Sequence, residues 1–324
     1  MRVFVTRQLP VDPAEVLEGH RVEVWPDPGP PSAAVLRERA AECDALLTLL
    51  SDRVDASLLD AAPRLQVVAN YAVGFDNIDL QAARTRGIWV THTPGTLTDA
   101  TADLTFTLLL AVARRLPEAE ADARTGDFGH WSPTAFLGLE LAGARLGILG
   151  FGAIGRAVAR RARGFGMKVR YSSRSPIPPG EREGAEPADF DELLATSDVI
   201  SIHAPLTEST RGLFDAAALA RMKSGARLIN TARGPIVDES ALVAALESGQ
   251  LAGAGLDVFE DEPRVHPGLV GRSDVVLTPH IGSATTEARR RMARKALRNI
   301  AAVLDGREPP DPIPGSHPQR ATTP

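Results

Sequence analysis

Two residues able to act on a carbonyl group follow predicted strands in the last third of the sequence. Arg233 comes directly after the predicted strand 227–230, and His280 comes after the predicted strand 275–278. Ligands of open α/β sheets bind beyond the carboxyl ends of the strands. A guanidinium there can hold a 2-oxo acid through its carboxylate and carbonyl oxygens. Histidine is the side chain best able to supply a proton near neutral pH. The two residues therefore predict a centre that reduces a carbonyl group.

An acidic segment lies between these two residues and includes Glu260, Asp261 and Glu262. Three acids so close together usually indicate a solvated loop. A carboxylate bonded to the second ring nitrogen of a histidine would, however, favour the imidazolium and fix the orientation of the ring. The residues alone leave both interpretations of this segment open.

A glycine-rich turn predicts the source of the hydride. Gly150, Gly152 and Gly155 fit the pattern G-x-G-x-x-G, after an apolar strand at 145–149 and before a helix that runs to Arg163. The first glycine makes the tight turn, the second lets a pyrophosphate approach the backbone, and the third lets the helix pack on the strand. Such a turn can also serve chain geometry alone, but this context predicts dinucleotide binding. We expect the contacts to include the residues between the glycines, namely Phe151, Ala153 and Ile154.

The next predicted strand, 168–171, is followed by residues that select the cofactor. NAD enzymes place Asp or Glu about 20 residues beyond the glycines, where it bonds the ribose hydroxyls. This chain has Ser173, Arg174 and Ser175 instead, so no carboxylate repels a 2′-phosphate, and a guanidinium with flanking hydroxyls can bind one. A solvated turn that tolerates either cofactor is the alternative. We expect NADP(H) to be preferred and NAD(H) to be possible.

Strand and helix signals alternate along the chain in two blocks. Strands are expected at 3–6, 22–25, 45–50, 65–70 and 88–91 in the first block, and at 145–149, 168–171, 199–203, 227–230, 253–257 and 275–278 in the second. Long helices are expected at 98–115 and 285–304, and the proline-rich tail from Asp305 is expected to be irregular. Strands separated by single helices predict an α/β fold with parallel sheets covered on both faces.

The composition excludes several classes of function. A chain of 324 residues with 44% apolar and 24% charged residues can form two packed domains. The formal net charge of −5 gives no electrostatic footprint for nucleic acid. Cys43 is the single cysteine, which excludes an intrachain disulfide and fits a reducing compartment. No signal-peptide core or membrane-length apolar segment is recognised. We expect a cytoplasmic protein with no nucleic-acid, membrane or metal partner.

From about residue 1 to 305 the chain resembles the D-isomer-specific 2-hydroxyacid dehydrogenase family, and within it the glyoxylate/hydroxypyruvate reductase branch. The most specific motifs are the segment 70–79 (Asn-Tyr-Ala-Val-Gly-Phe-Asp-Asn-Ile-Asp), the glycine turn, and the segments 230–234, 253–263 and 279–283. The resemblance implies a Rossmann-type cofactor domain, residues 98–284, inserted in a flavodoxin-like substrate domain, residues 1–97 and 285–324.

The resemblance also implies roles for single residues. Arg233 would orient the substrate, and Glu262 would pair with His280, the proton donor. Backbone N–H groups near Val73 and Gly74 would receive the substrate carboxylate. Leu50 could form an apolar wall near the substrate, although core packing explains it equally well. The remaining cofactor contacts are expected at the ends of the last strands, from Thr231, Ala232, Arg233, Asp257, His280 and Gly282.

Subunits of this family pair through their cofactor domains. In the glyoxylate/hydroxypyruvate branch an aromatic residue of the partner reaches the active site, and Trp131 matches that region. The resemblance therefore implies a homodimer in which Trp131 borders the active site of the other subunit.

Several subgroups of the family can be compared with this sequence. Formate dehydrogenases have glutamine where this chain has Glu262, and phosphoglycerate dehydrogenases usually favour NAD and often carry a regulatory extension. We therefore expect the reduction of glyoxylate or hydroxypyruvate with NADPH. The alternatives are an NAD-linked dehydrogenase of another D-2-hydroxy acid and a dinucleotide-sensing corepressor that keeps the same Arg, Glu and His. The sequence does not rank the 2-oxo acids or give the direction of the reaction in the cell.

Overall fold

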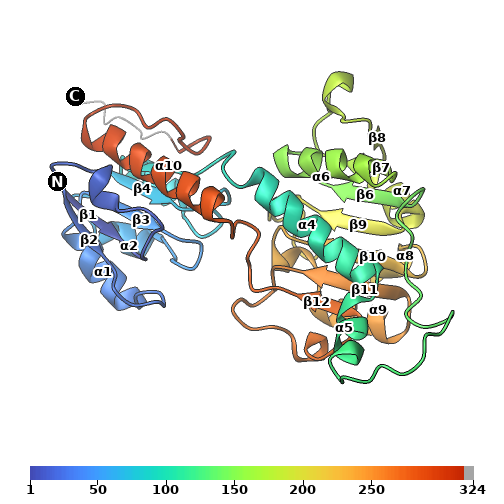
Figure 1. Cartoon of the computed structure of the whole chain (residues 1–324). Coiled ribbons are helices and arrows are strands. Elements are labelled where there is room, and N and C mark those ends of the chain that lie inside the picture. Colours follow the sequence, from blue (N-terminus) through green and yellow to red (C-terminus); the bar gives the residue numbers. More distant parts are fainter. Residues whose placement is uncertain (317–324) are drawn as a thin grey trace. The chain divides into compact units, whose positions relative to one another are not determined.

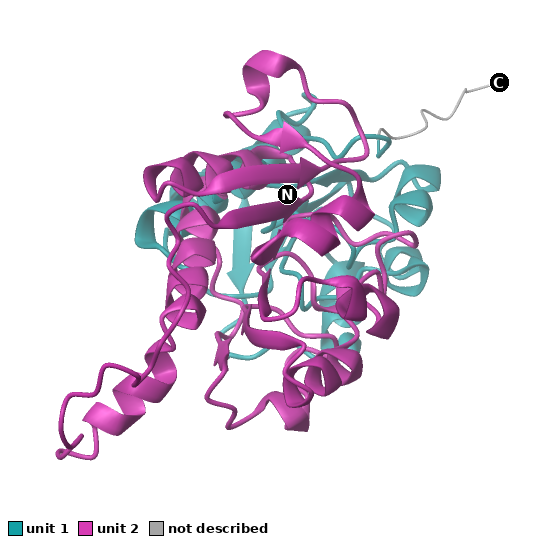
Figure 2. Cartoon of the chain, turned by 90° about the vertical axis from the view of Figure 1, so that its right-hand side faces the viewer, with its two compact units in different colours: residues 1–97, 284–324 teal, residues 98–283 magenta. Residues whose placement is uncertain are grey.

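A computed structural model describes residues 1–316; residues 317–324, which the expected substrate domain includes, lie outside the described part. The chain divides into two compact units, coloured separately in Figure 2. Unit 1 contains residues 1–97 and the chain from residue 284 onward, and unit 2 contains residues 98–283. Within residues 1–316 no helix combines the length and the apolar character needed to cross a membrane.

Unit 1 is built on a five-stranded parallel sheet in the order β2-β1-β3-β4-β5 (Figure 1). Its strands are β1 (Arg2–Val5), β2 (Arg21–Val24), β3 (Ala45–Thr48), β4 (Val67–Asn70) and β5 (Trp89–Thr91). This order is the flavodoxin-like arrangement, which reverses direction between β1 and β3. The carboxyl ends of β1, β3 and β4 therefore share one edge of the sheet.

Helices cover both faces of this sheet. They are η1 (Pro13–Glu15), α1 (Ala33–Ala41), α2 (Ala56–Asp60), α3 (Leu80–Thr85) and α10 (Thr286–Leu304). Side chains alternate between the two faces, so that Phe4 packs in the cluster with α1, α2 and α3, while Val3 and Val5 pack against Leu297 and Ile300 of α10. The final long helix thus contributes to the core on one face of unit 1.

The chain after α10 has no helix or strand between residues 305 and 316, as expected for its proline content, yet it is packed. Ile313 is fully buried, and Asp311 forms an ion pair of 2.7 Å with Lys295 of α10. Pro312 forms an isolated bridge with Thr91 at the end of β5. This segment therefore covers the edge strand of the sheet.

Unit 2 is built on a seven-stranded parallel sheet in the order β12-β11-β10-β9-β6-β7-β8. Its strands are β6 (Arg145–Leu149), β7 (Lys168–Ser172), β8 (Glu186–Pro187), β9 (Val199–Ile202), β10 (Ala226–Asn230), β11 (Leu251–Leu256) and β12 (Val275–Leu277). This is the Rossmann order, and its direction reverses between β6 and β9, where such sheets bind their ligands. The short strand β8 was not expected, because its two residues include a proline and carry no apolar alternation.

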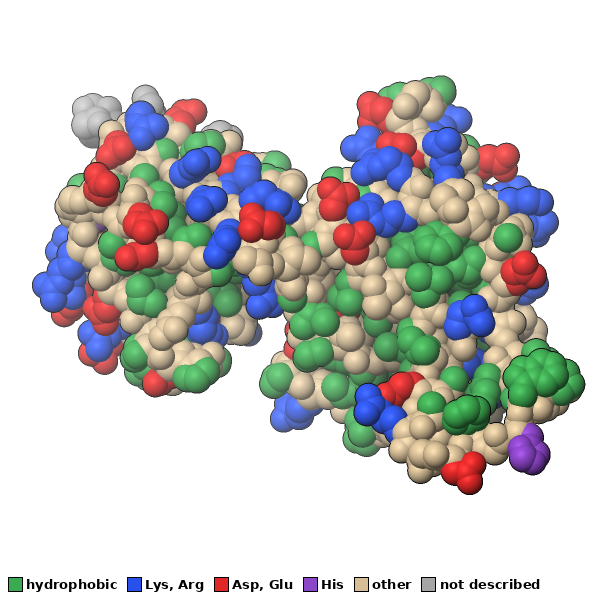
Figure 3. Space-filling view, viewed as in Figure 1, with side chains coloured by type: hydrophobic (Ala, Val, Ile, Leu, Met, Phe, Trp, Pro, Cys, Tyr) green, Lys and Arg blue, Asp and Glu red, His purple; other side chains and the backbone are tan. Residues whose placement is uncertain are grey.

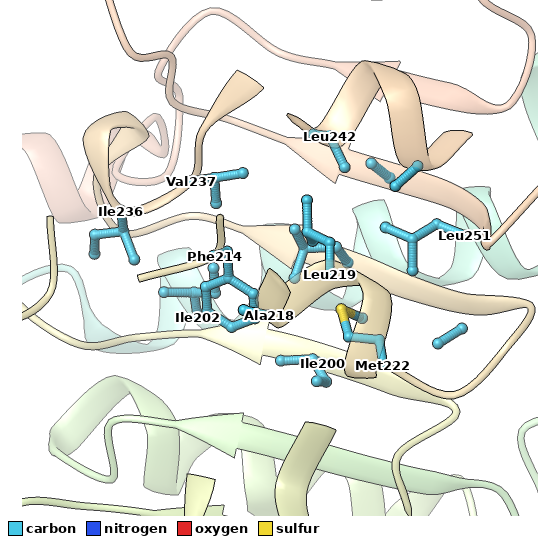
Figure 4. Packing of buried hydrophobic residues seen from close by; sticks show 14 of the residues in the cluster. Ile200, Ile202, Phe214, Ala218, Leu219, Met222, Ile236, Val237, Leu242 and Leu251 are labelled. Atoms are coloured by element: carbon cyan, nitrogen blue, oxygen red, sulfur yellow. The ribbon is translucent and has the colours of Figure 1, made fainter. Parts of the chain in front are cut away.

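Two hydrophobic clusters fill the faces of this sheet. The helices are α4 (Thr98–Ala113), α5 (Leu116–Ala123), α6 (Ala153–Gly164), α7 (Phe190–Thr196), α8 (Ala216–Arg221) and α9 (Glu239–Glu247), with short 3-10 turns η2 (Pro179–Glu181), η3 (Gly234–Ile236) and η4 (Pro267–Leu269). On β10, Leu228 packs in the cluster with α7, α8 and α9, and Ile229 packs in the cluster with α4 and α6. Figure 4 shows the first of these clusters, in which Phe214, Leu219 and Met222 lie among strand residues. The expected fold class, two α/β domains with parallel sheets, is confirmed.

Candidate active site

The glycine turn lies between β6 and α6, and its three glycines meet different steric requirements. Gly150 has a φ of 89°, and a Cβ there would lie 2.5 Å from the backbone nitrogen of Ala204. A Cβ at Gly155 would lie 2.3 Å from the carbonyl oxygen of Gly150, so glycine lets α6 pack against the turn. At Gly152, by contrast, a Cβ would meet no atom of the described residues within 4 Å. Gly152 is also the N-cap of α6 and gives no side-chain cap, so the first turn of the helix is open to an anion.

The residues between these glycines differ in what they can offer a ligand. Phe151 is buried, and its ring stacks on that of Tyr171 with 4.1 Å between centroids, so only its backbone is available. Ala153 is exposed and Ile154 is half-buried at the start of α6. An open, uncapped helix start beside a small side chain fits the pyrophosphate of a dinucleotide.

The residues expected to select the cofactor follow β7, which is the neighbour of β6 in the sheet. Ser173 is half-buried, and Arg174 and Ser175 are exposed. Among residues 1–316, Arg174 takes part in no ion pair, whereas the nearby Arg170 is paired with Glu192. The carboxyl end of β7 therefore carries a guanidinium that is not neutralised by the described residues.

Arg233 follows β10 in a short loop that side chains hold in place. The side-chain amide of Asn230 donates to the carbonyl oxygen of Arg233 at 2.9 Å and accepts from the N–H of Ala232 at 3.0 Å. The hydroxyl groups of Thr231 and Thr105 lie 2.9 Å apart, which ties this loop to α4. The guanidinium of Arg233 donates to the carbonyl oxygen of Ala232 at 2.8 Å. The expected ligand contacts Thr231, Ala232 and Arg233 thus share one fixed loop.

Gly234 brings this loop against the acidic segment that follows β11. A Cβ at Gly234 would lie 1.9 Å from the carbonyl carbon and oxygen of Phe259, so any other residue would separate the two loops. The contact places Arg233 close enough to Glu262 for its charge to act on that carboxyl group.

Glu262 and His280 form a hydrogen-bonded pair. Nδ1 of His280 lies 2.8 Å from Oε2 of Glu262, and each side chain is 36% exposed. The second oxygen, Oε1, accepts from the N–H of Phe259 at 3.1 Å. Because Glu262 accepts from Nδ1, the other ring nitrogen, Nε2, is the one available to a substrate. The structure therefore brings together three residues that the sequence separates, Arg233, Glu262 and His280.

The two acids beside Glu262 face other partners. Oε2 of Glu260 accepts from the N–H of Glu239 at 3.5 Å, and Asp261 forms an ion pair of 2.8 Å with Arg264. Of the three neighbouring acids, Glu262 is the one on the histidine. The sequence left this choice open apart from the family resemblance.

Asp257 holds the segment that carries His280. Its carboxylate is buried: Oδ1 accepts from the hydroxyl of Thr278 and the N–H of Ile281, both at 2.7 Å, and Oδ2 accepts from the N–H of Gly282 at 2.8 Å. His280 has a φ of 53°, a left-handed conformation that is uncommon for a residue with a side chain, and its N–H donates to the carbonyl oxygen of Asp257. The carboxylate of Asp257 is therefore hydrogen-bonded within the segment 278–282. The cofactor contacts expected from Asp257 and Gly282 stay predictions.

The pKa values of Glu262 and Asp257 are shifted in opposite directions. Burial acts to raise the pKa of Glu262, but the hydrogen bond and charge of His280, the N–H of Phe259 and the charge of Arg233 together lower it. Burial raises the pKa of Asp257 and outweighs the lowering effect of its three hydrogen bonds. The lowered pKa of Glu262 keeps its carboxylate ionised beside the histidine ring at neutral pH.

Two threonines of α4 belong to this arrangement and were not recognised in the sequence. The hydroxyl of Thr101 donates to the carbonyl oxygen of Gly282 at 3.1 Å, and Thr105 contacts Thr231 as described. Both are buried, and the other buried residues of this helix are apolar. Threonines four residues apart on such a helix are the signal that could have indicated a polar contact.

The residues expected to meet the substrate carboxylate lie in unit 1, in the loop after β4. Val73 and Gly74 are half-buried, and their carbonyl groups are bonded by Nδ1 of His92 at 2.9 Å and by the side chain of Asn70 at 2.9 Å. Leu50 follows β3 and is half-buried; its neighbour Leu49 packs in the cluster with α10.

Trp131 lies in unit 2 after α5, in a segment rich in exposed apolar side chains. Trp131 is 86% exposed, and Phe128 and Leu137 are each about two-thirds exposed. Figure 3 shows apolar side chains gathered on the surface beyond α5. Trp131 is the most exposed of the large hydrophobic side chains of residues 1–316.

Known proteins match the chain over almost its whole length. The family described as D-isomer specific 2-hydroxyacid dehydrogenase, NAD binding domain, matches residues 106–282. The glyoxylate reductase of Thermococcus litoralis is 52% identical over 316 residues, which is 96% of each chain. A crystal structure of a protein from Thermus thermophilus is 49% identical and has a TM-score of 0.91, and the match covers 97% of this chain and 100% of that chain.

A second solved structure is an NADPH-dependent glyoxylate/hydroxypyruvate reductase from Sinorhizobium meliloti in complex with NADP and malonate. It is 33% identical, with a TM-score of 0.85 and 99% of each chain covered. The predicted enzyme class is thereby confirmed: this chain reduces 2-oxo acids with a nicotinamide dinucleotide. The chain belongs to the D-isomer specific 2-hydroxyacid dehydrogenase family.

Proposed function

We propose that this enzyme reduces glyoxylate or hydroxypyruvate to the 2-hydroxy acid and prefers NADPH. The observation that carries the proposal is the 2.8 Å pair of His280 and Glu262, set beside the loop of Arg233 in the unit that contains the glycine turn. Relatives named glyoxylate reductase support the choice of substrate, because several of them are about 50% identical to this chain.

The proposed substrate has a carboxylate and a carbonyl oxygen, and the chain has candidate groups to bind each of them. Arg233 presents a planar guanidinium, which can bond the carboxylate and the carbonyl oxygen of a 2-oxo acid together. The N–H groups of Val73 and Gly74 are proposed to receive the same carboxylate, which agrees with the half-buried position of both residues.

The proton is proposed to come from Nε2 of His280. A bound nicotinamide dinucleotide supplies the hydride, so negative charge develops on the carbonyl oxygen of the substrate. Glu262 accepts from Nδ1, favours the imidazolium, and orients Nε2 toward that oxygen. Asp257 holds residues 278–282 by hydrogen bonds and so fixes the position of the His280 backbone that carries the ring.

The preference for NADPH rests on the end of β7. The three residues 173–175 contain no carboxylate, and Arg174 is exposed without an ion pair among the described residues. A 2′-phosphate would supply the anion that this guanidinium lacks. The Sinorhizobium meliloti reductase, whose structure contains NADP, is similar over 99% of this chain.

A homodimer is part of the proposal, with Trp131 contacting the partner subunit. The motivation is the group of exposed apolar side chains around Trp131, which a second copy of the chain would bury. Sedimentation at micromolar concentration should give a dimer, and Trp131→Ala should weaken it. A monomeric wild-type protein would overturn this part and leave the catalytic proposal intact.

The proposed reaction is tested by a spectrophotometric panel of 2-oxo acids with NADPH and NADH in separate series. We expect the highest kcat/KM for glyoxylate or hydroxypyruvate with NADPH. Equal values with NADH would overturn the cofactor preference. Faster turnover of pyruvate or of larger 2-oxo acids would overturn the substrate choice.

A further inference from the structure

Three consecutive carbonyl groups in the loop after β4 each accept a hydrogen bond from a different donor. Ala72 accepts from the backbone N–H of Thr93 at 2.8 Å, Val73 from Nδ1 of His92 at 2.9 Å, and Gly74 from Nδ2 of Asn70 at 2.9 Å. A carbonyl oxygen can only accept, so His92 carries a proton on Nδ1. These three bonds hold the loop by its carbonyl side.

Because the peptide group is planar, a hydrogen bond that fixes a carbonyl group also fixes the direction of the N–H of the next residue. In a trans peptide the N–H points away from the C=O of the same unit. The bond from Thr93 to the Ala72 carbonyl therefore directs the N–H of Val73, and the bond from His92 to the Val73 carbonyl directs the N–H of Gly74. Within residues 1–316 neither of these N–H groups donates a hydrogen bond. Both therefore point away from residues 92 and 93.

The ring of His92 is itself fixed. It follows β5 directly, and its backbone N–H donates to the carbonyl oxygen of Asp311 at 3.2 Å. The ring meets that of Phe75 edge to face, with 6.0 Å between centroids and 78° between planes. A donor held this firmly also polarises the peptide group that accepts from it, which strengthens the opposite N–H as a donor.

We propose that His92 is a positioning residue for the substrate: its Nδ1–H orients and polarises the Gly74 N–H that binds the substrate carboxylate. The inference rests on the proposed function, in which the N–H groups of Val73 and Gly74 receive that carboxylate. His92 acts through the Val73 peptide group, to which its ring nitrogen is bonded, and not on the reacting atoms. Its loss should therefore weaken carboxylate binding and leave the chemical step unchanged.

The test compares His92→Asn with His92→Gln. The amide nitrogen of asparagine can occupy the place of Nδ1 and still donate to Val73, whereas that of glutamine reaches the place of Nε2 instead. Both replacements are polar and uncharged, so a difference between them reports the position of the donor. His20→Asn in the same unit, far along the chain from β5, is the matched control. Three quantities are measured: KM and kcat for glyoxylate with saturating NADPH, and the Kd of oxamate by calorimetry in the presence of NADPH. The KM for NADPH is determined in a separate series.

We expect His92→Gln to raise the KM for glyoxylate and the Kd of oxamate together, by about tenfold, the effect of losing one hydrogen bond. Its kcat and its KM for NADPH should stay within about threefold of wild type. His92→Asn should recover most of the loss, and His20→Asn should behave as wild type. A wild-type KM in His92→Gln, or equal losses in the asparagine and glutamine variants, would overturn the positioning role.

Failure of the proposed function has a different signature. A wild-type enzyme that turns over neither glyoxylate nor hydroxypyruvate would overturn that function. Weaker oxamate binding by His92→Gln would still support the role of His92 in that case, and unchanged oxamate binding would overturn it as well.

Discussion

The carboxyl edges of the two sheets carry different kinds of polar group. In unit 2 the loops after β10, β11 and β12 present ionisable side chains, of which Glu262 and His280 are hydrogen-bonded to each other. In unit 1 the loop after β4 presents peptide N–H groups, and side chains such as Asn70 and His92 hold the loop by its carbonyl groups. One edge offers groups that gain or lose protons, and the other offers fixed dipoles.

This difference predicts how each edge responds to mutation. Loss of a side chain that acts on the reacting atoms should lower kcat. A peptide N–H binds substrate and transition state about equally, so disturbing it should change KM. The comparison fails if a change in unit 1 abolishes turnover. It also fails if His280→Ala in unit 2 alters KM alone.

The largest expected effect is that of His280→Ala. Removal of the proposed proton donor should lower kcat for reduction by roughly two to four orders of magnitude, the usual contribution of a positioned general acid. Affinity for NADPH, measured by fluorescence titration, should change little. A variant with near wild-type kcat for glyoxylate would remove the chemical role from this edge.

The next effect separates two glycines of the same turn. Gly150→Ala should lower the free energy of unfolding by about 1–3 kcal/mol, because its Cβ would lie 2.5 Å from a backbone atom at a φ of 89°. Gly152→Ala, whose Cβ meets open space, should keep the thermal midpoint within a few degrees and raise the KM for NADPH and NADH alike. Similar unfolding curves for the two variants would contradict the different roles inferred from their surroundings.

Arg174→Ala sharpens the comparison within unit 2, since this cation binds rather than reacts. We expect the KM for NADPH to rise by a factor that corresponds to about 1.5–3 kcal/mol, with the KM for NADH nearly unchanged. Arg160→Ala removes the same charge from an exposed position of α6, where Arg160 is paired with Glu183, and serves as the control. Equal effects of Arg174→Ala on both cofactors would mean that this residue does not read the 2′-phosphate.

Glu262→Gln should have the smallest effect, a change in pH dependence. The pKa of Glu262 is lowered, so its carboxylate is ionised wherever the enzyme is assayed, and it stabilises the protonated ring. Loss of that charge should shift the decline of reduction toward lower pH. Asp261→Asn, which removes a neighbouring charge paired with Arg264, should leave the profile in place. An unshifted profile in Glu262→Gln would contradict the proposed role of the pair.

Much of the fold was predictable because it depends on local signals. The spacing of apolar runs indicated every described strand except β8 within a few residues, and the glycine pattern located the turn after β6. The two residues of β8 carried no such signal. The helix expected at 98–115 ends at Ala113, because Arg115 takes a left-handed φ of 51°. A single left-handed residue is a tertiary outcome that side-chain patterns do not reveal.

The site was predictable in its residue types more than in its contacts. The strand-end positions of Arg233 and His280 indicated a reaction centre, but nothing local distinguished Glu262 from the two acids before it. The threonines of α4 and the bonds of Asp257 connect residues far apart in sequence. Such contacts depend on the path of the backbone, which periodicity does not specify.

The contact between Gly234 and Phe259 has a consequence for building chimeras of this enzyme with its relatives. The backbones of the two loops are in direct contact. Even a methyl group at residue 234 would overlap the Phe259 carbonyl. A crossover placed between these positions would join loops that were never fitted to each other, whereas crossovers before β10 or after β12 would transfer them as one cassette. The guanidinium and the carboxylate of the site are therefore expected to be inherited, and exchanged, as a single block.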